Sequence, residues 1–517
     1  MISDRYGTTI VLSIFIIAGF FRFTDLSSRP MHGDEAINAV KLSGVVETGQ
    51  FDYKPTQHHG PLLYFTGYLF SAFHGLDGIQ DFSEEFLRSV TGFVGILLLW
   101  IGFTFKKSLQ NNVLYLAFGL MAVSPSLVFY SRFFIHEIII VFFSLGMIAS
   151  GYQYLKTEKS LWLALTGVAL GCMISTKETW PLFLIAMGSS AAILYFHKGV
   201  KRLISLKHGI TIAGIAVATT FLFYSDFFRD INNSTDAFLA FKPYLERVSS
   251  EGIHNHPWYF YLNIIFPLGH SGSWLHLGEG LLFLVFIFNL PLMLRSEKQP
   301  ITIQFLFWYS LVLLFVFSAI PYKTPWNILG IMPGMIIVSA NTIVNQIYKL
   351  NQKILGNIFI VLLGGLLMLQ SYSYNFKNEA NPANPYVYAH PTKDIFTIET
   401  KIHDMANVLT NEIDFSVFVM ATGDDYWPFP WYLRDMDNVG YWNHVPLDVG
   451  SASVVLVSSD LTDNLVKTIY EKAEPGMSSL LIPLFDEMME LRPGVEISGY
   501  VKKDVYDLYE RLSSHDG

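Results

Sequence analysis

Two adjacent carboxylates, Asp34 and Glu35, follow the first long apolar run of the chain within the sequence His-Gly-Asp-Glu. A carboxylate beside a lipid surface can deprotonate an incoming hydroxyl, and the pair could hold a divalent cation such as Mg²⁺ or Mn²⁺. Helix capping is the alternative, with Asp34 as the N-cap and Glu35 in the first turn, where the helix dipole favours acids. A capping carboxylate can still react, so both interpretations stay open.

Further charged residues occupy three short turns between apolar runs. A charged cluster at the start of a membrane span is costly unless it faces a polar cavity, and anchoring at the interface is the alternative. Lysines at external helix ends would suit the phosphate of a lipid carrier. The residues are Arg132, His136 and Glu137 in the first turn, Lys177 and Glu178 in the second, and Lys323 with Tyr322 in the third.

The histidine pairs His58-His59 and His254/His256 lack a third ligand at a spacing typical of zinc sites. The chain contains neither a Walker motif nor a dinucleotide-binding fingerprint. The sequence therefore gives no indication of a soluble nucleotide donor or of ATP-driven transport.

The composition is that of a multi-pass membrane protein. Of 517 residues, 51% are hydrophobic and only 15% are charged, whereas soluble proteins carry about 25% charged residues. The net charge of -9 argues against nucleic-acid binding. The single cysteine, Cys172, excludes an intrachain disulfide.

The apolar runs predict about eleven membrane-spanning helices. Lys and Arg cluster in every second loop, and these basic loops mark the cytoplasmic side, which places the N-terminus inside and Asp34 outside a plasma or inner membrane. The predicted spans are Thr8–Phe23, Val90–Phe105, Val113–Tyr130, Ile138–Tyr154, Leu161–Ser175, Trp180–Phe196, Ile210–Tyr224, Trp274–Leu294, Ile303–Ile320, Ile328–Ile347 and Ile354–Leu369.

Residues 27–88 form the first external loop in this topology. Within it, Glu35–Thr48 and Pro61–Phe73 are expected to lie as helices in the outer interface. Counting the second segment as a span would move Lys106 and every later basic loop to the wrong side.

The chain divides after Tyr372 into a transmembrane domain, residues 1–372, and a small extracytoplasmic α/β domain, residues 373–517. No spanning run occurs in the second part, which is rich in acids and proline. The expected elements are strands at Ser416–Ala421 and Ser453–Ser458 and helices at Leu461–Lys472 and Leu484–Leu491.

Five motifs, in this order, make residues 1–372 resemble the GT-C glycosyltransferase superfamily, in the branch of protein O-mannosyltransferases and lipid A aminoarabinose transferases. The motif sequences are most similar to those of a prokaryotic subgroup of flippase-activity-associated membrane proteins. Glu178 and Gly60 depart from the Gly and Pro usual in that pattern. The motifs are His32-Gly33-Asp34-Glu35-Ala36, Gly60-Pro61-Leu62-Leu63-Tyr64, Ser175-Thr176-Lys177-Glu178, His256-Pro257-Trp258-Tyr259-Phe260-Tyr261 and the run from Lys323 to Pro333.

The resemblance implies an inverting transfer of a sugar from a polyprenyl-phosphate carrier to an external acceptor. Asp34 would be the base, and Glu35 would assist it or orient a metal. The remaining implied substrate contacts are Lys177, Lys323 and Arg132 for the phosphate, with His59, Tyr64, His256 and Tyr322 nearby. Expected partners are the lipid-linked sugar, membrane lipid, and flippase or glycan-assembly proteins.

Two other functions are compatible with the same motifs. A non-catalytic partner of a flippase or polymerase would bind the same lipid without needing Asp34. A transporter should carry broken helices and polar groups near the middle of the membrane. The charges gather instead at helix ends, which disfavours transport.

Overall fold

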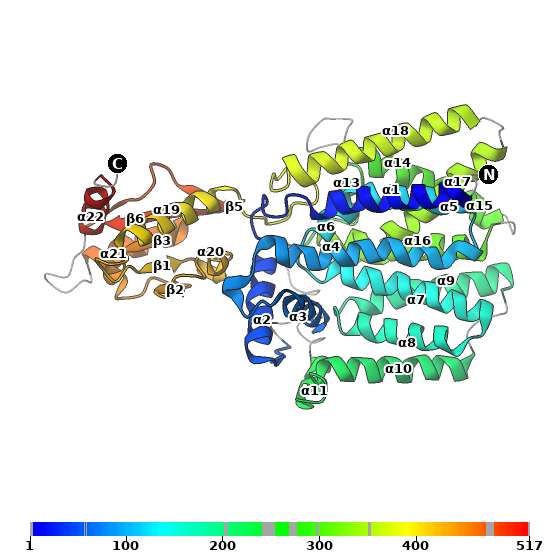
Figure 1. Ribbon diagram of the computed structural model, residues 1–517, viewed down its shortest axis with the longest axis horizontal. Coiled ribbons are helices and arrows are strands. Elements are labelled where there is room, and N and C mark those ends of the chain that lie inside the picture. Colours follow the sequence, from blue (N-terminus) through cyan, green and yellow to red (C-terminus); the bar gives the residue numbers. More distant parts are fainter. Residues whose placement is uncertain are drawn as a thin grey trace.

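The computed structural model describes residues 4–55, 57, 59–200, 205–239, 254–267, 277–295, 299–349, 353–471 and 480–514. Figure 1 shows a bundle of long helices with a small mixed domain at one end, and the N-terminus at the other end of the bundle. The loops that contain Asp34, Lys177 and Lys323 were predicted to share one side of the membrane. The site described below gathers residues from all three of these regions.

The bundle makes this a helical membrane protein. Among the described residues, seven helical stretches are long and apolar enough to span a bilayer, or eight if one bent pair counts as a span. The helices that form the predicted spans, two of them in two pieces, are α1 (Asp4–Phe23), α4 (Glu84–Ile101), α5 (Asn111–Val123), α6 (Pro125–Ser131), α7 (Glu137–Thr157), α8 (Ser160–Ile174), α9 (Trp180–Lys198), α10 (Leu206–Tyr224), α14 (Gly278–Ile287), α15 (Leu290–Arg295), α16 (Ile301–Ala319), α17 (Met332–Lys349) and α18 (Lys353–Tyr372).

The other three predicted spans correspond to α1, α8 and α17. The apolar parts of α1 and α8 are shorter than a full span, and α17 carries polar residues such as Asn341 and Asn345. The count of eleven spans therefore stays a prediction. Shorter helices α11 (Asn232–Leu239) and α13 (Phe260–Ile265) and the 3₁₀ turn η4 (Pro325–Gly330) connect parts of the bundle.

The predicted span Val113–Tyr130 is bent by 57° between α5 and α6. Pro125 begins α6, and Ser124 before it has an extended backbone. Proline lacks the N–H for a helical hydrogen bond and disfavours a helical conformation in the preceding residue. The bend follows from this one residue.

Helices α2 (Gly33–Thr48) and α3 (Leu62–His74) form where interfacial helices were predicted. Figure 1 shows α2 crossing the ends of the long helices instead of running beside them. Within the described part of the chain, neither helix is among those that could span a bilayer. Their position at a membrane surface stays a prediction.

The C-terminal domain contains a six-stranded mixed sheet in the order β2-β1-β3-β6-β4, with β5 also paired to β6. Strand β1 pairs in parallel with β2 and β3, and β6 runs antiparallel to β3. Its elements are α19 (Asp394–Leu409), β1 (Val417–Met420), α20 (Phe429–Tyr432), β2 (Val439–Trp442), β3 (Val454–Ser458), α21 (Thr462–Tyr470), β4 (Leu481–Pro483), β5 (Met489–Arg492), β6 (Val495–Lys502) and α22 (Lys503–Ser513).

Both predicted strands of this domain are confirmed, as β1 and β3, and every residue of β3 is buried. The predicted helix Leu461–Lys472 is confirmed as α21, although Lys472 lies outside the described residues. The predicted helix Leu484–Leu491 is wrong. Its second half forms β5, where Met489 pairs with Ile497 and Leu491 is fully buried, because tertiary strand pairing outweighs a weak local helical preference.

The C-terminal domain packs against the segment that leads into α2. The backbone N–H of Met31 donates to the Tyr432 hydroxyl at 2.8 Å, and the Trp431 indole N–H donates to Glu84 at 2.8 Å. The His32 ring lies 2.9 Å from the carbonyl of Tyr388. These contacts fix the start of α2, and therefore the direction of its first side chains.

Candidate active site

A cavity of about 500 Å³ lies where α2 and α3 meet the turns before α7, before α9 and after α16. The predicted site residues Asp34, His59, Tyr64, Lys177 and Tyr322 all line it. Segments up to about 290 positions apart in sequence thus supply one polar chamber among apolar helices. Its other ionisable or aromatic lining residues are Lys41, His136, Glu137, Glu178, Phe317 and Trp326.

Asp34 lies in the first turn of α2 and points its carboxylate into this cavity, with 53% of the side chain exposed. The helix is capped by His32, not by Asp34 as predicted. The His32 ring accepts the backbone N–H of Asp34 at 3.0 Å. Because the histidine ring satisfies that donor, the Asp34 carboxylate is not needed for capping and stays open to a ligand.

Glu35, by contrast, is fully buried and does not line the cavity. Arg88 donates to both of its oxygens, at 2.9 and 2.7 Å, and the backbone N–H groups of Phe134 and His32 donate at 2.9 and 3.2 Å. Arg29 lies 3.7 Å away. Burial alone would raise the pKa of Glu35, but the two arginines and the hydrogen bonds lower it to about 2.

Helix geometry separates these two neighbours. Successive residues of an α-helix point about 100° apart, whereas residues four and seven positions apart share a face. Asn38 and Lys41 therefore follow Asp34 along the cavity side of α2. The sequence analysis missed both, although their spacing from Asp34 was the available signal.

Lys41 and Lys177 are the two lysines of the described cavity lining. The Lys41 ammonium donates to the carbonyl of Gln57. Burial lowers the pKa of Lys41 to about 8, a shift that the charge of Asp34 partly opposes. Asn38 accepts a hydrogen bond from the Tyr64 hydroxyl at 2.9 Å, which joins α2 to α3.

Lys177 follows α8 and is almost fully buried at the cavity wall. Its ammonium donates to the buried carboxylate of Glu137 and lies 5.8 Å from the centre of the Trp326 ring. The turn fits tightly against Gly60, where an added Cβ would come within 2.2 Å of the Ser175 carbonyl oxygen. The Gly60 N–H also donates to Thr176 at 3.2 Å, so the proline usual in the family pattern does not fit here.

Glu178, beside Lys177, is also buried at the cavity wall. One of its oxygens lies 2.7 Å from His59 Nδ1. Burial raises the pKa of Glu178, but the charge and hydrogen bond of His59 outweigh it and hold the pKa below its usual value. Burial lowers the pKa of the neighbouring His136 well below its ordinary value, so this ring is neutral.

Three predicted phosphate or substrate contacts do not line the cavity. The Lys323 ammonium is buried and donates to the carbonyls of His256, at 2.9 Å, and Ile320. The His256 ring stacks on Phe260 at 4.2 Å. Arg132 donates to carbonyls at the end of α1, including that of Thr24 at 2.6 Å.

The side chains of Asp34 and Glu35 have different surroundings, since Asp34 lines the cavity and Glu35 is bonded to Arg88. Among the described residues, no group of three or more His, Cys, Asp or Glu side chains could hold a metal ion. His58, one of the paired histidines considered for zinc binding, lies outside the described residues. Metal binding by the acidic pair stays a prediction.

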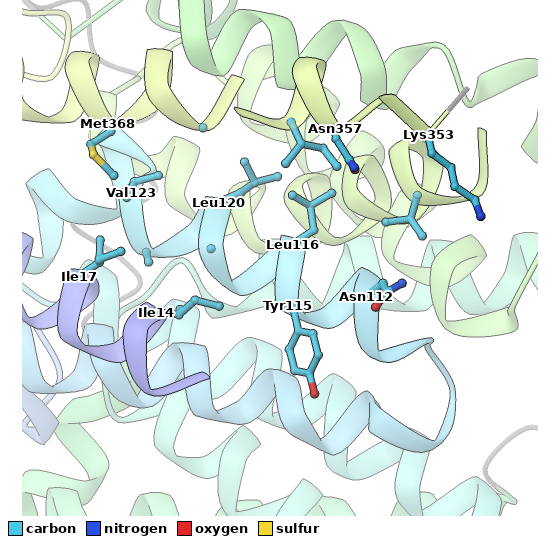
Figure 2. Close-up of a pocket in the computed structure, with 15 residues that line it drawn as sticks. Ile14, Ile17, Asn112, Tyr115, Leu116, Leu120, Val123, Lys353, Asn357 and Met368 are labelled. Atoms are coloured by element: carbon cyan, nitrogen blue, oxygen red, sulfur yellow. The ribbon is translucent and has the colours of Figure 1, made fainter. Parts of the chain in front are cut away.

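A second cavity, of about 720 Å³, opens between α1, α5 and α18. Figure 2 shows Lys353 and Asn112 toward one end of it and Met368 and Ile17 toward the other. Aliphatic side chains dominate its lining, and no acid or histidine is among its described lining residues. A cavity of this kind can hold an apolar chain, and its described lining offers no carboxylate or imidazole as a base.

Comparison with known proteins identifies relatives of this architecture. The family model of dolichyl-phosphate-mannose-protein mannosyltransferase matches residues 78–229. An uncharacterized protein of Aquifex aeolicus (strain VF5) is 21% identical over 353 residues, which cover 66% of this chain and 64% of that protein. The alignment thus spans slightly less than two thirds of that relative.

Two solved structures share the fold. ArnT from Cupriavidus metallidurans, bound to undecaprenyl phosphate, has a TM-score of 0.61 at 12% identity, covering 96% of this chain and 98% of ArnT. The archaeal oligosaccharyltransferase AglB from Archaeoglobus fulgidus has a TM-score of 0.56 at 11% identity, covering 88% and 69%. The chain therefore has an ArnT-like fold. The match over residues 78–229 and the ArnT-like fold agree with the predicted resemblance. Membership of the GT-C superfamily and of the flippase-associated subgroup stays a prediction.

Proposed function

We propose that this protein is a glycosyltransferase that moves a sugar from a polyprenyl-phosphate carrier to an acceptor outside the cytoplasm. The observation that carries the proposal is the cavity whose lining combines a half-exposed carboxylate, Asp34, with two lysines, Lys41 and Lys177. The family match and the ArnT-like fold support it.

In the proposed reaction, Asp34 accepts the proton of an acceptor hydroxyl. The freed oxygen bonds to the anomeric carbon while the bond from that carbon to the phosphate oxygen breaks, which inverts the configuration. The polyprenyl phosphate leaves with the electron pair. Because a phosphate already leaves well, one base suffices, unlike the two carboxylates of glycoside hydrolysis.

Lys177 and Lys41 are the groups that we assign to the phosphate, since both residues line the cavity. A positioned cation stabilises the charge that develops on the leaving phosphate. Lys323 and Arg132 do not line the cavity, and their cationic groups donate to backbone carbonyls. We therefore assign to them the support of the surrounding turns.

The remaining predicted site residues also divide into those that line the cavity and those that support its surroundings. His59, Tyr64 and Tyr322 line the cavity and are assigned to the sugar or acceptor. His256 stabilises the turn that holds Lys323. Glu35 is assigned a positioning role, because its charge anchors α2 through Arg88.

The test is transfer by the purified wild-type protein in proteoliposomes that contain a polyprenyl-phosphate sugar labelled in the sugar. The expected result is release of polyprenyl phosphate and movement of the label to an acceptor fraction from cell envelopes. A protein that binds the lipid but never releases the sugar, with a panel of donor sugars, would contradict the proposal. That outcome would favour the alternative, a lipid-binding partner of a flippase or polymerase.

A further inference from the structure

Glu178 has an unfilled hydrogen-bonding position at the cavity wall. Its side chain is 5% exposed, and Oε2 is bonded to His59 at 2.7 Å. The other oxygen, Oε1, is sealed from water and has no hydrogen-bond partner in the described part of the chain. A carboxylate has about four acceptor positions, and leaving a buried one unfilled is costly.

The unfilled oxygen belongs to a residue that faces the proposed reaction centre. Glu178 and Asp34 line the same cavity. Burial raises the pKa of the Tyr64 hydroxyl, and the charges of Glu178 and Asp34 raise it further, so both carboxylates act on one side chain of the same lining. The last torsion of a glutamate side chain is soft, so rotation about it can present Oε1 to the cavity that Glu178 lines.

Glu137, the other buried carboxylate of the cavity, differs from Glu178 in this respect. Glu137 is paired with the ammonium of Lys177, and Glu178 is paired with a histidine ring. Of these two acids, Glu178 is the one with a sealed oxygen that has no hydrogen-bond partner among the described residues. Glu178 is thus the buried acid with acceptor capacity left for a ligand.

We propose that Glu178 binds a hydroxyl of the donor sugar through Oε1, and that its negative charge makes the site select neutral sugars and reject uronic acids. This inference rests on the proposed function and names the substrate class of the same cavity. Once the donor phosphate has engaged Lys41 and Lys177, a sugar carboxylate would face Asp34 and Glu178, while His59 in the same lining is already bonded to Glu178.

The test is equilibrium binding to the full-length protein in nanodiscs, with three probes. They are polyprenyl phosphate without sugar, a polyprenyl-phosphate neutral hexose, and the corresponding hexuronic acid. Binding is measured separately from transfer. A protein that discriminates these probes without transferring sugar would contradict the proposed catalysis but keep this subsite.

The informative variant is Glu178→Gln, which removes the charge and keeps the shape. We expect it to weaken binding of the neutral hexose probe about tenfold, the loss typical of a hydrogen bond to a charged group. It should leave binding of the bare polyprenyl phosphate unchanged and strengthen binding of the hexuronic acid. Glu412→Gln, at an exposed position of the C-terminal domain, is the matched control.

A second variant, Glu178→Asp, keeps the test decisive if Glu178→Gln does not fold. Its shorter side chain should lose affinity for the neutral hexose while its charge still excludes the uronic acid. An equal weakening of all three probes would assign Glu178 a structural role and overturn the proposal. An unchanged ratio of hexose to uronic acid affinity in Glu178→Gln would also overturn the proposal. If that variant does not fold, unchanged affinity of Glu178→Asp for the neutral hexose would overturn it.

Discussion

The first turn of α2 has two sides with opposite surroundings, although each side carries one carboxylate. On the cavity side, the Asp34 side chain is 53% exposed, whereas on the buried side Glu35 is fully enclosed by Arg88, Arg29 and backbone donors. The C-terminal domain holds the backbone just before this turn. The difference suggests that one acid is reactive because its neighbour fixes the helix that presents it.

The largest expected effect is on the cavity side. Asp34→Asn keeps the shape of the side chain but cannot accept a proton, so transfer should fall by about 10²–10⁴-fold. Stability should change little, because His32 caps the helix and the Asp34 carboxylate makes no capping bond. The measurement is the rate of transfer from a labelled donor, with thermal unfolding as the control. Full transfer by this variant would show that Asp34 is not the base. The two sides of the turn would then not differ in reactivity.

The buried side should respond in the opposite way. Glu35→Gln leaves the buried guanidinium of Arg88 without its counter-charge. Breaking a buried ion pair in this way typically costs about 3–5 kcal/mol. We expect a markedly lower unfolding temperature in detergent but substantial transfer per folded molecule at low temperature. A stable Glu35→Gln protein that has lost transfer would instead make Glu35 part of the chemistry.

The same ion pair predicts how stability depends on pH. The pKa of Glu35 is lowered from 4.5 to about 2 in the folded protein. A carboxylate with a depressed pKa stabilises the folded state fully above its unfolded pKa, and the contribution is lost as pH falls from about 4.5 toward 2. The unfolding temperature should therefore drop over this range, and the drop should be smaller in Glu35→Gln. Identical profiles for both proteins would exclude Glu35 as the titrating group.

An intermediate effect is expected at Lys177. Lys177→Met removes a charged partner of the donor phosphate, a loss of roughly 1.5–3 kcal/mol in binding. Because this change also leaves Glu137 unpaired, the double variant Lys177→Met with Glu137→Gln is the matched comparison and should bind the donor better than the single variant.

Lys323→Met should affect stability more than donor affinity, since its ammonium donates to backbone carbonyls. Equal losses of affinity at Lys177 and Lys323 would contradict this assignment.

The sequence could predict much of the cavity, because its motifs lie at helix ends that share one end of the bundle. Lys177, His59, Tyr64 and Tyr322 were expected near the substrate and all line the cavity. The role of Glu35 could not be predicted, because its partner Arg88 lies 53 positions away. No local pattern shows which of two adjacent acids meets that arginine.

The fold divides in a similar way. Apolar runs predicted the positions of the long helices, and Pro125 held the signal for the bend between α5 and α6. In the C-terminal domain, the buried strands β1 and β3 were predictable from their apolar residues. Strand β5 was not, because its strand conformation depends on pairing with β6, which no local sequence signal reports.

The smallest expected effect concerns Lys41, seven positions after Asp34 on the cavity side of α2. Burial lowers its pKa from 10.5 to about 8, so the amine loses its proton and its positive charge as pH rises through that value. The donor is a phosphate diester that keeps one charge over this range, so donor affinity should weaken above pH 8, by up to about tenfold near pH 9. Bound phosphate favours the ammonium form and moves the midpoint upward. The measurement is donor affinity between pH 7 and 9.5 in the wild type and in Lys41→Met, where this part of the dependence should vanish. If the two profiles coincide, Lys41 does not contact the phosphate, and the cavity side of α2 contributes only the base.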